Sequence, residues 1–276
     1  MKKILLIHQN FWRNPYYNLA IEESIAINLV ESEFIAALRI WKNQNTTVLG
    51  ISDKIEKNIP AAILENFKTL FPKITANKKI IPEISYVVRR ASGGGTVLHT
   101  EKSNLNYSIF VSLQDQPNLY DVKKSYTLLL GLVIGALKKQ NIDSAMAGKS
   151  DLSILENSLE KKISGNAQFR KKDCVVQHGT LILDLSILEK VTELLSHPPE
   201  EPEYRKNRTH RDFLTCLPKE FSEKIFASDL KFNLVEFLNA KSVSENRNLK
   251  FWKKILTDAN RLYTEKYATL EFICSR

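Results

Sequence analysis

One glycine-rich stretch is central to the fold of this chain: Arg89-Arg90-Ala91-Ser92-Gly93-Gly94-Gly95-Thr96-Val97-Leu98-His99. The 276 residues include only nine glycines, and three of them are consecutive here. Residues without a Cβ accept positive φ and let the backbone approach a ligand, and arginines offer forked donors to anions. The stretch therefore predicts a loop that binds a carboxylate or phosphate. A tight turn between two strands, with both arginines in solvent, is the alternative.

Strand-like segments lie on both sides of this loop. They are rich in β-branched and aromatic residues or alternate apolar with polar positions, as strands with one buried face do. These segments are 37–41, 46–50, 85–89, 104–111, 174–178 and 180–184. The first two are joined by four polar residues, which predicts a hairpin. Residues 4–7 predict one further strand near the start.

Helical patterns flank the strands. Asn14-Pro15 combines an N-cap side chain with proline at the first helical position, and apolar residues follow at helical spacing. Residues 122–139 predict a buried crossover helix, and residues 252–263 carry an apolar helical face. His197 to Pro202 predicts a loop because of its prolines. The pattern as a whole predicts an α+β fold, a mixed or antiparallel sheet flanked by helices.

Composition narrows the class of protein. Hydrophobic residues make up 43% and charged residues 26%, which is typical of a globular chain. We expect residues 1–276 to form one catalytic domain, mainly helical after about residue 197, without a separate full-size accessory domain. No apolar run is long enough for a membrane span, and three dispersed cysteines predict no disulfide framework, so a cytoplasmic location is expected. A net charge of +9 fits either a solvated surface or an acidic partner.

Several other glycines lie beside groups that bind phosphate or carbonyl oxygen. They fall in residues 148–151, 162–167 and 178–180. Gly148-Lys149-Ser150 is similar to the end of a P-loop, but the glycine required five residues earlier is Asp143, so a Walker A site is excluded. No GxGxxG motif follows a strand, which removes support for a dinucleotide fold.

Taken together, these motifs resemble the lipoate-protein ligase A family, which is related to biotin ligases and octanoyltransferases. The resemblance rests on motifs in the same order along most of the chain. They are residues 14–23, 41–43, 48–50, 89–99, 104–108, 162–167 and 177–181. It implies the α+β catalytic domain of biotin and lipoate ligases, similar to class II synthetases.

The resemblance also implies roles for particular residues. Lys162 corresponds to the catalytic lysine, whose cation neutralises charge on the acyl carbonyl and α-phosphate. Asp151 matches an acidic position near the nucleotide, where it suits Mg²⁺ or the incoming lysine. The expected substrate- and nucleotide-binding residues are Arg89, Arg90, Ser92, Gly93, Gly94, Gly95, Thr96, His99, Asp151, Ser164, Gly165, Ala167, His178 and Gly179. Without the resemblance, Lys162 is an ordinary surface lysine, and His99 and His178 are packing or hydrogen-bonding groups.

The implied activity is activation of lipoate with ATP and Mg²⁺ to lipoyl-AMP, followed by transfer to a lysine of a carrier. Expected carriers are the lipoyl domains of 2-oxoacid dehydrogenase complexes or the glycine cleavage H protein, with an accessory subunit as a further partner. The basic surface would suit an acidic lipoyl domain. Nucleic acid is not expected as a partner, because the aromatic residues are not interleaved with a basic strip. A membrane is not expected either, because no apolar run is long enough to span one.

Two alternatives stay open. A transferase would use preformed acyl-AMP or an acyl-carrier donor, and Cys174 is its candidate nucleophile, although a strand-like apolar run favours a buried thiol there. A non-catalytic lipoate-binding protein is the other, but mere binding would not require the cation of Lys162. Thr100 and Ser150 depart from the family pattern, which has an acid and an asparagine at those positions.

Overall fold

A central mixed sheet organises the molecule. The computed structural model describes residues 2–8, 14–76, 85–194, 201–244 and 248–276. The sheet has eight strands in the order β11-β1-β2-β6-β10-β9-β8-β7. They are β1 (Lys3–His8), β2 (Phe34–Trp41), β6 (Asn104–Ser112), β7 (Ser144–Ala147), β8 (Asp151–Glu156), β9 (Leu159–Lys171), β10 (Cys174–Ile182) and β11 (Lys241–Ser244). β11, β1 and β2 run parallel, and the remaining neighbours are antiparallel. The expected α+β class is confirmed.

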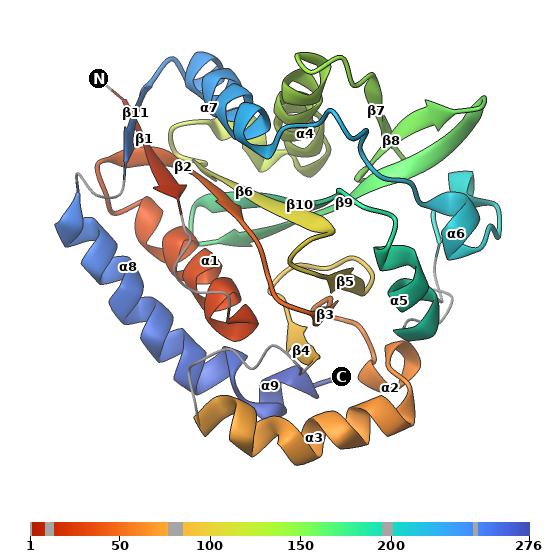
Figure 1. Cartoon of the computed structure of the whole chain (residues 1–276). Helices are drawn as coiled ribbons and strands as arrows, with labels where there is room; N and C mark the ends of the chain where they lie inside the picture. The colour runs from red at the N-terminus through yellow and green to blue at the C-terminus, as the bar shows by residue number, and fades with distance from the viewer. Residues whose placement is uncertain (1, 9–13, 77–84, 195–200, 245–247) are drawn as a thin grey trace.

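Helices cover both faces of this sheet (Figure 1). α1 (Pro15–Leu29) and α8 (Leu249–Leu262) lie on one face, and α4 (Val122–Lys138) and α7 (Glu223–Leu238) lie on the other. Each face has its own hydrophobic cluster: Phe110 of β6 belongs to the first and its neighbour Ile109 to the second. All nine residues of β6 are buried, so the polar side chains that alternate along it are buried too.

Capping side chains mark the starts of α1 and α4. The Asn14 carboxamide oxygen accepts from the backbone N–H groups of Tyr16 (3.0 Å) and Tyr17 (3.2 Å), with proline at the first helical position. Asp121 caps α4 by accepting from the Lys124 N–H at 2.7 Å. Both helix predictions, at Asn14-Pro15 and at 122–139, are confirmed.

A second, small sheet carries the glycine-rich loop. It contains β3 (Thr46–Leu49), β4 (Tyr86–Arg89) and β5 (Val97–His99), with β3 in the middle. The predicted hairpin between 37–41 and 46–50 is wrong, because β2 pairs with β1 and β6 in the large sheet while β3 pairs with β4 and β5. The polar connection is responsible: Asn43 is buried and hydrogen-bonded to Asn18 and His99, so it fixes the crossing from one sheet to the other.

The remaining elements lie at the edges of the two sheets. They are α2 (Ile55–Asn58), α3 (Ala61–Ala76), η1 (Pro117–Tyr120), α5 (Ile187–Leu194), η2 (Glu203–Arg205), α6 (His210–Phe213), the π-turn η4 (Tyr263–Tyr267) and α9 (Leu270–Ile273). After residue 197 the chain is mostly helical where it is described, but β11 is a strand that the sequence did not predict. It joins the sheet parallel to β1. Of the predicted loop at 197–202, residues 197–200 lie outside the described part of the chain. Within the described ranges no helix is long and apolar enough to cross a membrane.

Candidate active site

Arg90 shapes the glycine loop, residues 92–96, from within. Its Nη2 donates to the carbonyl oxygens of Gly93 (2.6 Å) and Gly95 (2.9 Å), and its Nε donates to the Ser92 hydroxyl at 2.9 Å. Burial lowers the pKa of Arg90 to about 10, so the guanidinium is still protonated at neutral pH. Arg90 therefore binds the backbone carbonyl oxygens of the loop. The sequence had suggested a contact between this arginine and a substrate anion.

Arg89 lies at the back of the same loop. It is fully buried, and its Nη1 donates to the carbonyl oxygens of Gly50 (2.7 Å) and Asp53 (2.8 Å), while its Nε donates to that of Ile273 at 3.0 Å. The side chain thereby joins α9 to the turn after β3. The structure thus places Arg89 against protein carbonyls, where it supports the loop, and does not present it as the phosphate contact expected from the sequence.

The glycines in the loop and behind it fall into two kinds. A Cβ on Gly50 would lie 2.1 Å from the Gly94 carbonyl oxygen, and Gly94 has φ of +83°, so these two positions require glycine. Gly93 and Gly95 have open space where a Cβ would be. The loop is therefore packed on one side and open on the other, as a ligand-binding loop must be.

Asp53 fixes the far end of the loop. Its Oδ2 accepts from the Gly50 N–H at 2.9 Å and from the Thr96 hydroxyl at 2.7 Å. Thr96 was expected from the sequence to be a binding residue, whereas Asp53 was not predicted to belong to the site. Nothing in its sequence neighbourhood separates it from an ordinary turn aspartate.

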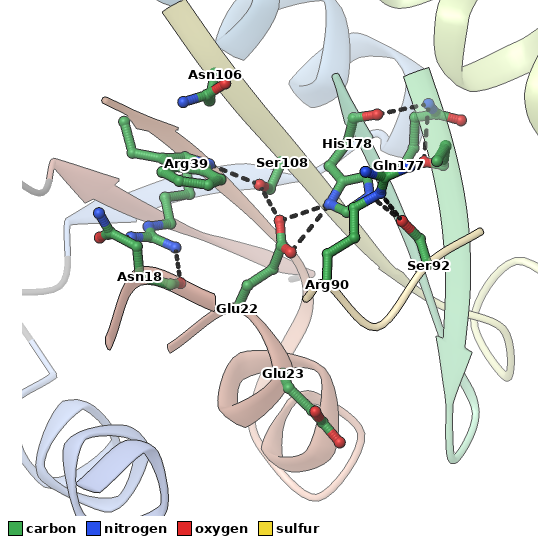
Figure 2. A network of polar contacts seen from close by, with 12 residues as sticks. Asn18, Glu22, Glu23, Arg39, Arg90, Ser92, Asn106, Ser108, Gln177 and His178 are labelled. Atoms are coloured by element: carbon green, nitrogen blue, oxygen red, sulfur yellow. Dashed lines mark hydrogen bonds and ion pairs between the residues drawn. The ribbon is translucent and has the colours of Figure 1, made fainter. Parts of the chain in front are cut away.

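A buried network connects the loop to the sheet (Figure 2). His178 of β10 places Nε2 2.7 Å from the Ser92 hydroxyl and Nδ1 3.0 Å from both carboxylate oxygens of Glu22 on α1. The Ser108 hydroxyl donates to Glu22 Oε1 at 2.6 Å. We call these four residues the Glu22–His178 network. Figure 2 shows Glu22 directed into it, whereas its neighbour Glu23 points away.

The network keeps Glu22 charged although the residue is 2% exposed. Burial, the largest influence, would raise the pKa of Glu22, but the ion pair with His178, the hydrogen bonds and the nearby Arg39 together lower it. Arg39 binds the backbone and side-chain oxygens of Asn18 at 2.7 and 2.6 Å. Neither Glu22 nor Ser108 is on the list of expected site residues. The available signal was the row of polar positions along 104–111, which need partners once buried.

His99 belongs to a second chain of buried hydrogen bonds. Asn43, fixed by Asn18, donates to His99 Nδ1 at 3.1 Å, so the proton of the ring lies on Nε2, which donates to Thr180 at 2.9 Å. Burial, reinforced by the positive charge of Arg90, lowers the pKa of His99 to about 3. The ring is therefore neutral, and both of its nitrogens have protein partners.

Lys162 stands on the β8–β9 hairpin. Its Nζ lies 2.8 Å from Asp151 Oδ1, with the two side chains 22% and 13% exposed. The preceding Lys161 pairs instead with Glu156 at 3.0 Å, because successive side chains of a strand point to opposite faces. The structure thus separates two adjacent lysines that the sequence alone could not distinguish.

Small residues make room around Lys162. A Cβ on Gly165 would lie 3.2 Å from Lys162 Nζ, and a Cβ on Gly179 would lie 1.9 Å from the side-chain oxygen of Asn166. Asn166 is tied to Ser150 by two hydrogen bonds, from Asn166 Nδ2 to the Ser150 carbonyl (2.7 Å) and from Ser150 Oγ to the Asn166 carbonyl (2.8 Å). Ser150 therefore anchors the hairpin although it departs from the family pattern.

The expected site residues from three sequence regions meet here. The glycine loop approaches β9, since a Cβ on Gly94 would lie 3.8 Å from that of Ala167, and Ser92 joins β10 through His178. Ser164 is buried and donates to the Asn166 side chain at 3.1 Å. Cys174 lies at the other end of β10 from Gly179 and is fully buried, which raises the pKa of its thiol.

The residues present bear on the expected Mg²⁺. No group of three or more candidate metal-ligating side chains occurs in the described part of the chain. Asp151 offers a carboxylate, but its two oxygens face Lys162 and the Tyr204 hydroxyl. Asp151 is therefore the carboxylate that this arrangement could offer to a Mg²⁺ ion carried by the phosphates of ATP, with water as the other ligands.

Comparison with known sequences identifies related proteins. Residues 14–239 match the lipoyl protein ligase A/B catalytic domain. The chain is 26% identical over 267 residues to lipoate-protein ligase LplJ of Bacillus subtilis, covering 96% of this chain and 71% of that protein. It is 31% identical over 174 residues to lipoate-protein ligase A of Blochmanniella floridana, covering 63% of this chain and 44% of that protein. The match thus spans less than half of the latter relative.

Solved structures show the same fold. A bipartite lipoate protein ligase from Thermoplasma acidophilum, solved in a study with its E2 lipoyl domain, superposes with a TM-score of 0.71 at 20% identity, covering 99% of this chain and 96% of that one. Another T. acidophilum structure, with bound lipoic acid, gives 0.68 at 19% identity, covering 99% of this chain and all of that one. A lipoate-protein ligase A bound with ATP gives 0.68 at 21% identity, covering 99% of each chain. The fold and the match over residues 14–239 establish that this chain belongs to the lipoyl protein ligase A/B catalytic domain family.

Proposed function

We propose that this protein activates lipoate with ATP to lipoyl-AMP and transfers the lipoyl group to a lysine of a carrier domain. The observation that carries the proposal is the place of Lys162. Its ammonium is held by Asp151 at 2.8 Å, lies over the Cβ-free Gly165, and shares β9 with Ala167, which faces the glycine loop. A cation on the strand that the open glycine loop approaches is suited to a carboxylate and a phosphate that must meet.

Both chemical steps use this arrangement. First, a carboxylate oxygen of lipoate attacks the α-phosphorus of ATP, and pyrophosphate leaves. Mg²⁺, when bound with ATP, would offset charge on the phosphates. Then the amine of the carrier lysine attacks the acyl carbonyl, and AMP leaves. Lys162 offsets the negative charge on the carbonyl and phosphate oxygens in both steps. Asp151 is the carboxylate available to accept a proton from the incoming ammonium group.

The binding residues have graded roles in this proposal. The open glycines, Gly93 and Gly95, let the substrate approach the backbone, while Arg90, Ser92 and His178 keep the loop in one shape. Preorganised donors of this kind stabilise a transition state without reorganising during the reaction. Relatives named lipoate-protein ligase, and neighbours solved with lipoic acid or with ATP, support the choice of substrates.

The carrier is proposed to be a lipoyl domain of a 2-oxoacid dehydrogenase complex or the glycine cleavage H protein. Support comes from the T. acidophilum ligase studied with its E2 lipoyl domain. The net charge of +9 favours an acidic carrier. An accessory subunit for the activation step is part of the same proposal, since the T. acidophilum ligase is described as bipartite.

A transferase that uses preformed acyl-AMP remains the second candidate, because it would need the same pocket and the same lysine. The route through a cysteine thioester is disfavoured at Cys174, whose thiol is fully buried with a raised pKa.

Intact-mass measurement of an apo lipoyl domain tests the proposal. The domain is incubated with the protein, lipoate, ATP and Mg²⁺, beside the variants Lys162→Ala and Lys161→Ala. We expect a lipoyl mass increment that requires ATP, disappears in Lys162→Ala and persists in Lys161→Ala, whose side chain is equally exposed but faces Glu156. An increment without ATP, or full activity of Lys162→Ala, would contradict it. An increment seen only with supplied lipoyl-AMP would support the transferase.

A further inference from the structure

Residues 201–217 form a segment that crosses the β8–β9 hairpin beside Lys162, and we call it the crossing segment. The Thr215 N–H donates to the Lys162 carbonyl oxygen at 2.9 Å, and Arg208 Nη1 donates to the Glu160 carbonyl oxygen at 2.8 Å. The segment is thus bound to the backbone of the strand that carries Lys162. Figure 1 shows α6, which belongs to it, beside this hairpin.

The segment has its own anchor. Phe213 is 2% exposed, and its ring lies 5.1 Å from that of Tyr204, 4.9 Å from the guanidinium of Arg205 and 5.3 Å from that of Arg208. Arg208 also donates to the Tyr204 carbonyl oxygen at 2.7 Å. Stacking of this kind fixes the backbone of Tyr204 and the direction of its ring.

Tyr204 reaches the Lys162–Asp151 pair. Its hydroxyl donates to Asp151 Oδ2 at 2.9 Å, while Lys162 Nζ lies 2.8 Å from the other oxygen, Oδ1. Each carboxylate oxygen therefore has one partner, which fixes the rotation of the carboxylate.

Gly148 makes this contact possible. It has φ of +56°, and a Cβ there would lie 3.2 Å from the Tyr204 ring and 3.1 Å from Pro202. A side chain at 148 would press on the ring from the β7–β8 turn. Gly148, whose neighbouring residues are similar to the end of a P-loop, thus leaves room for the Tyr204 ring.

We propose that Tyr204 is a positioning residue for the reaction: its hydroxyl holds Asp151, and Asp151 in turn aims the ammonium of Lys162 at the reacting carbonyl and phosphate. The inference rests on the function proposed above. Lysine has three donor hydrogens, so one bond to Asp151 leaves two for the substrate. Nothing in the proposal requires Tyr204 to touch the substrate.

Tyr204→Phe removes the hydroxyl and keeps the ring against Phe213. We expect kcat for lipoyl transfer to fall about tenfold, the effect of one hydrogen bond to a charged group, with KM for lipoate and ATP within about twofold. The matched control is Tyr120→Phe, because Tyr120 makes the same kind of bond, to Asp173 at 3.2 Å, on the exposed surface. An unchanged kcat in Tyr204→Phe, or a fall accompanied by a lower melting temperature, would overturn the inference.

Amine labelling gives a readout that does not depend on activity. The free protein is treated briefly with acetic anhydride, and acetylation of Lys162 is measured relative to Lys161 in the same peptide. We expect this ratio to rise at least about twofold in Tyr204→Phe, because a less firmly held ion pair exposes the amine more often, and to stay constant in Tyr120→Phe. A constant ratio in both variants would overturn the inference.

Two further variants separate this inference from the proposed function. Gly148→Ala should lower kcat as Tyr204→Phe does and add little to it in the double variant, because the added Cβ displaces the Tyr204 ring. Alanine at φ of +56° also strains the turn, so the variants are compared at temperatures well below their melting temperatures. Additive effects would contradict a shared contact. If Lys162→Ala is fully active, the proposed function itself fails. If Lys162→Ala is inactive while Tyr204→Phe equals the unchanged protein, only the role of Tyr204 fails.

Discussion

The Glu22–His178 network and the Lys162–Asp151 pair are both charged, yet they are built differently. The first lies under α1 in the middle of the large sheet, with side chains 2% and 10% exposed. The second lies on a hairpin near the edge of that sheet and is 22% and 13% exposed. A buried charge that is fully hydrogen-bonded gives rigidity, whereas a partly exposed one remains available to a substrate. We therefore propose that the first region maintains the shape of the glycine loop and that the second takes part in the chemistry.

Breaking the buried network should give the largest effect on stability. Glu22→Ala removes the acceptor of the Ser108 hydroxyl, the partner of His178 Nδ1 and the negative charge near the buried Arg39, and removal of one member of a buried charged pair costs about 3–5 kcal/mol. Urea unfolding at pH 7 measures this loss. The control, Glu31→Ala, removes an exposed glutamate that pairs with Lys172, and it should leave the unfolding midpoint nearly unchanged. Equal midpoints for the two variants would contradict the assignment.

A smaller effect is expected at the back of the glycine loop. Gly50→Ala brings a Cβ to 2.1 Å from the Gly94 carbonyl oxygen, so the loop must move, at a cost of about 1–3 kcal/mol. Ligase activity should fall as well, since the open side of the loop shifts. Gly131→Ala is the control: nothing lies within 4 Å of its Cβ, and alanine in a helix should be neutral or stabilising. A Gly50→Ala protein with unchanged stability would argue against the packed loop.

The buried glutamates should also make the stability of the protein depend on pH. Glu22 and Glu23 have pKa values lowered below the ordinary value of 4.5. Their contribution to stability is complete above that value and is lost as the pH falls through the lower pKa values of the folded state. Glu22→Gln should therefore show a shallower loss of stability between about pH 5 and 3 in urea titrations. Parallel curves for both proteins would exclude Glu22 as a source of the acid sensitivity.

The smallest effect is expected at Cys174. The thiol is fully buried with a raised pKa, so Cys174→Ser should leave lipoyl transfer unchanged. Iodoacetamide should also modify Cys174 in the folded protein far more slowly than in urea. Loss of transfer in the serine variant, with stability retained, would revive the thioester route.

The sequence predicted local structure better than it predicted pairing. The start of α1 followed from Asn14-Pro15, and α4 followed from its apolar spacing, because both signals are local. The prediction of a hairpin at residues 37–50 was wrong, because the pairing of these two strands is decided by strands that are distant in the sequence. β11 was not predicted because it is a strand of only four residues, which becomes extended only by pairing with β1.

The motifs in the sequence indicated where the candidate site lies, but they did not indicate which buried residues support it. Lys162, Asp151 and the glycine loop carry recognisable chemistry in a recognisable order. Arg89 and Arg90 were expected to contact an anion, and the direction of a guanidinium cannot be known before its neighbours are placed. Glu22, Asp53 and Tyr204 act through side chains far away in the sequence, so their roles emerge only with the fold.

Pyrophosphate exchange measures the role of Lys162 in adenylate formation separately from carrier recognition. The unchanged protein, Lys162→Ala and Lys161→Ala are compared for exchange of labelled pyrophosphate into ATP, with and without lipoate, at equal melting temperature. We expect lipoate-dependent exchange that falls about 100-fold or more in Lys162→Ala and is retained in Lys161→Ala. Exchange that proceeds equally in Lys162→Ala, or that does not need lipoate, would contradict it.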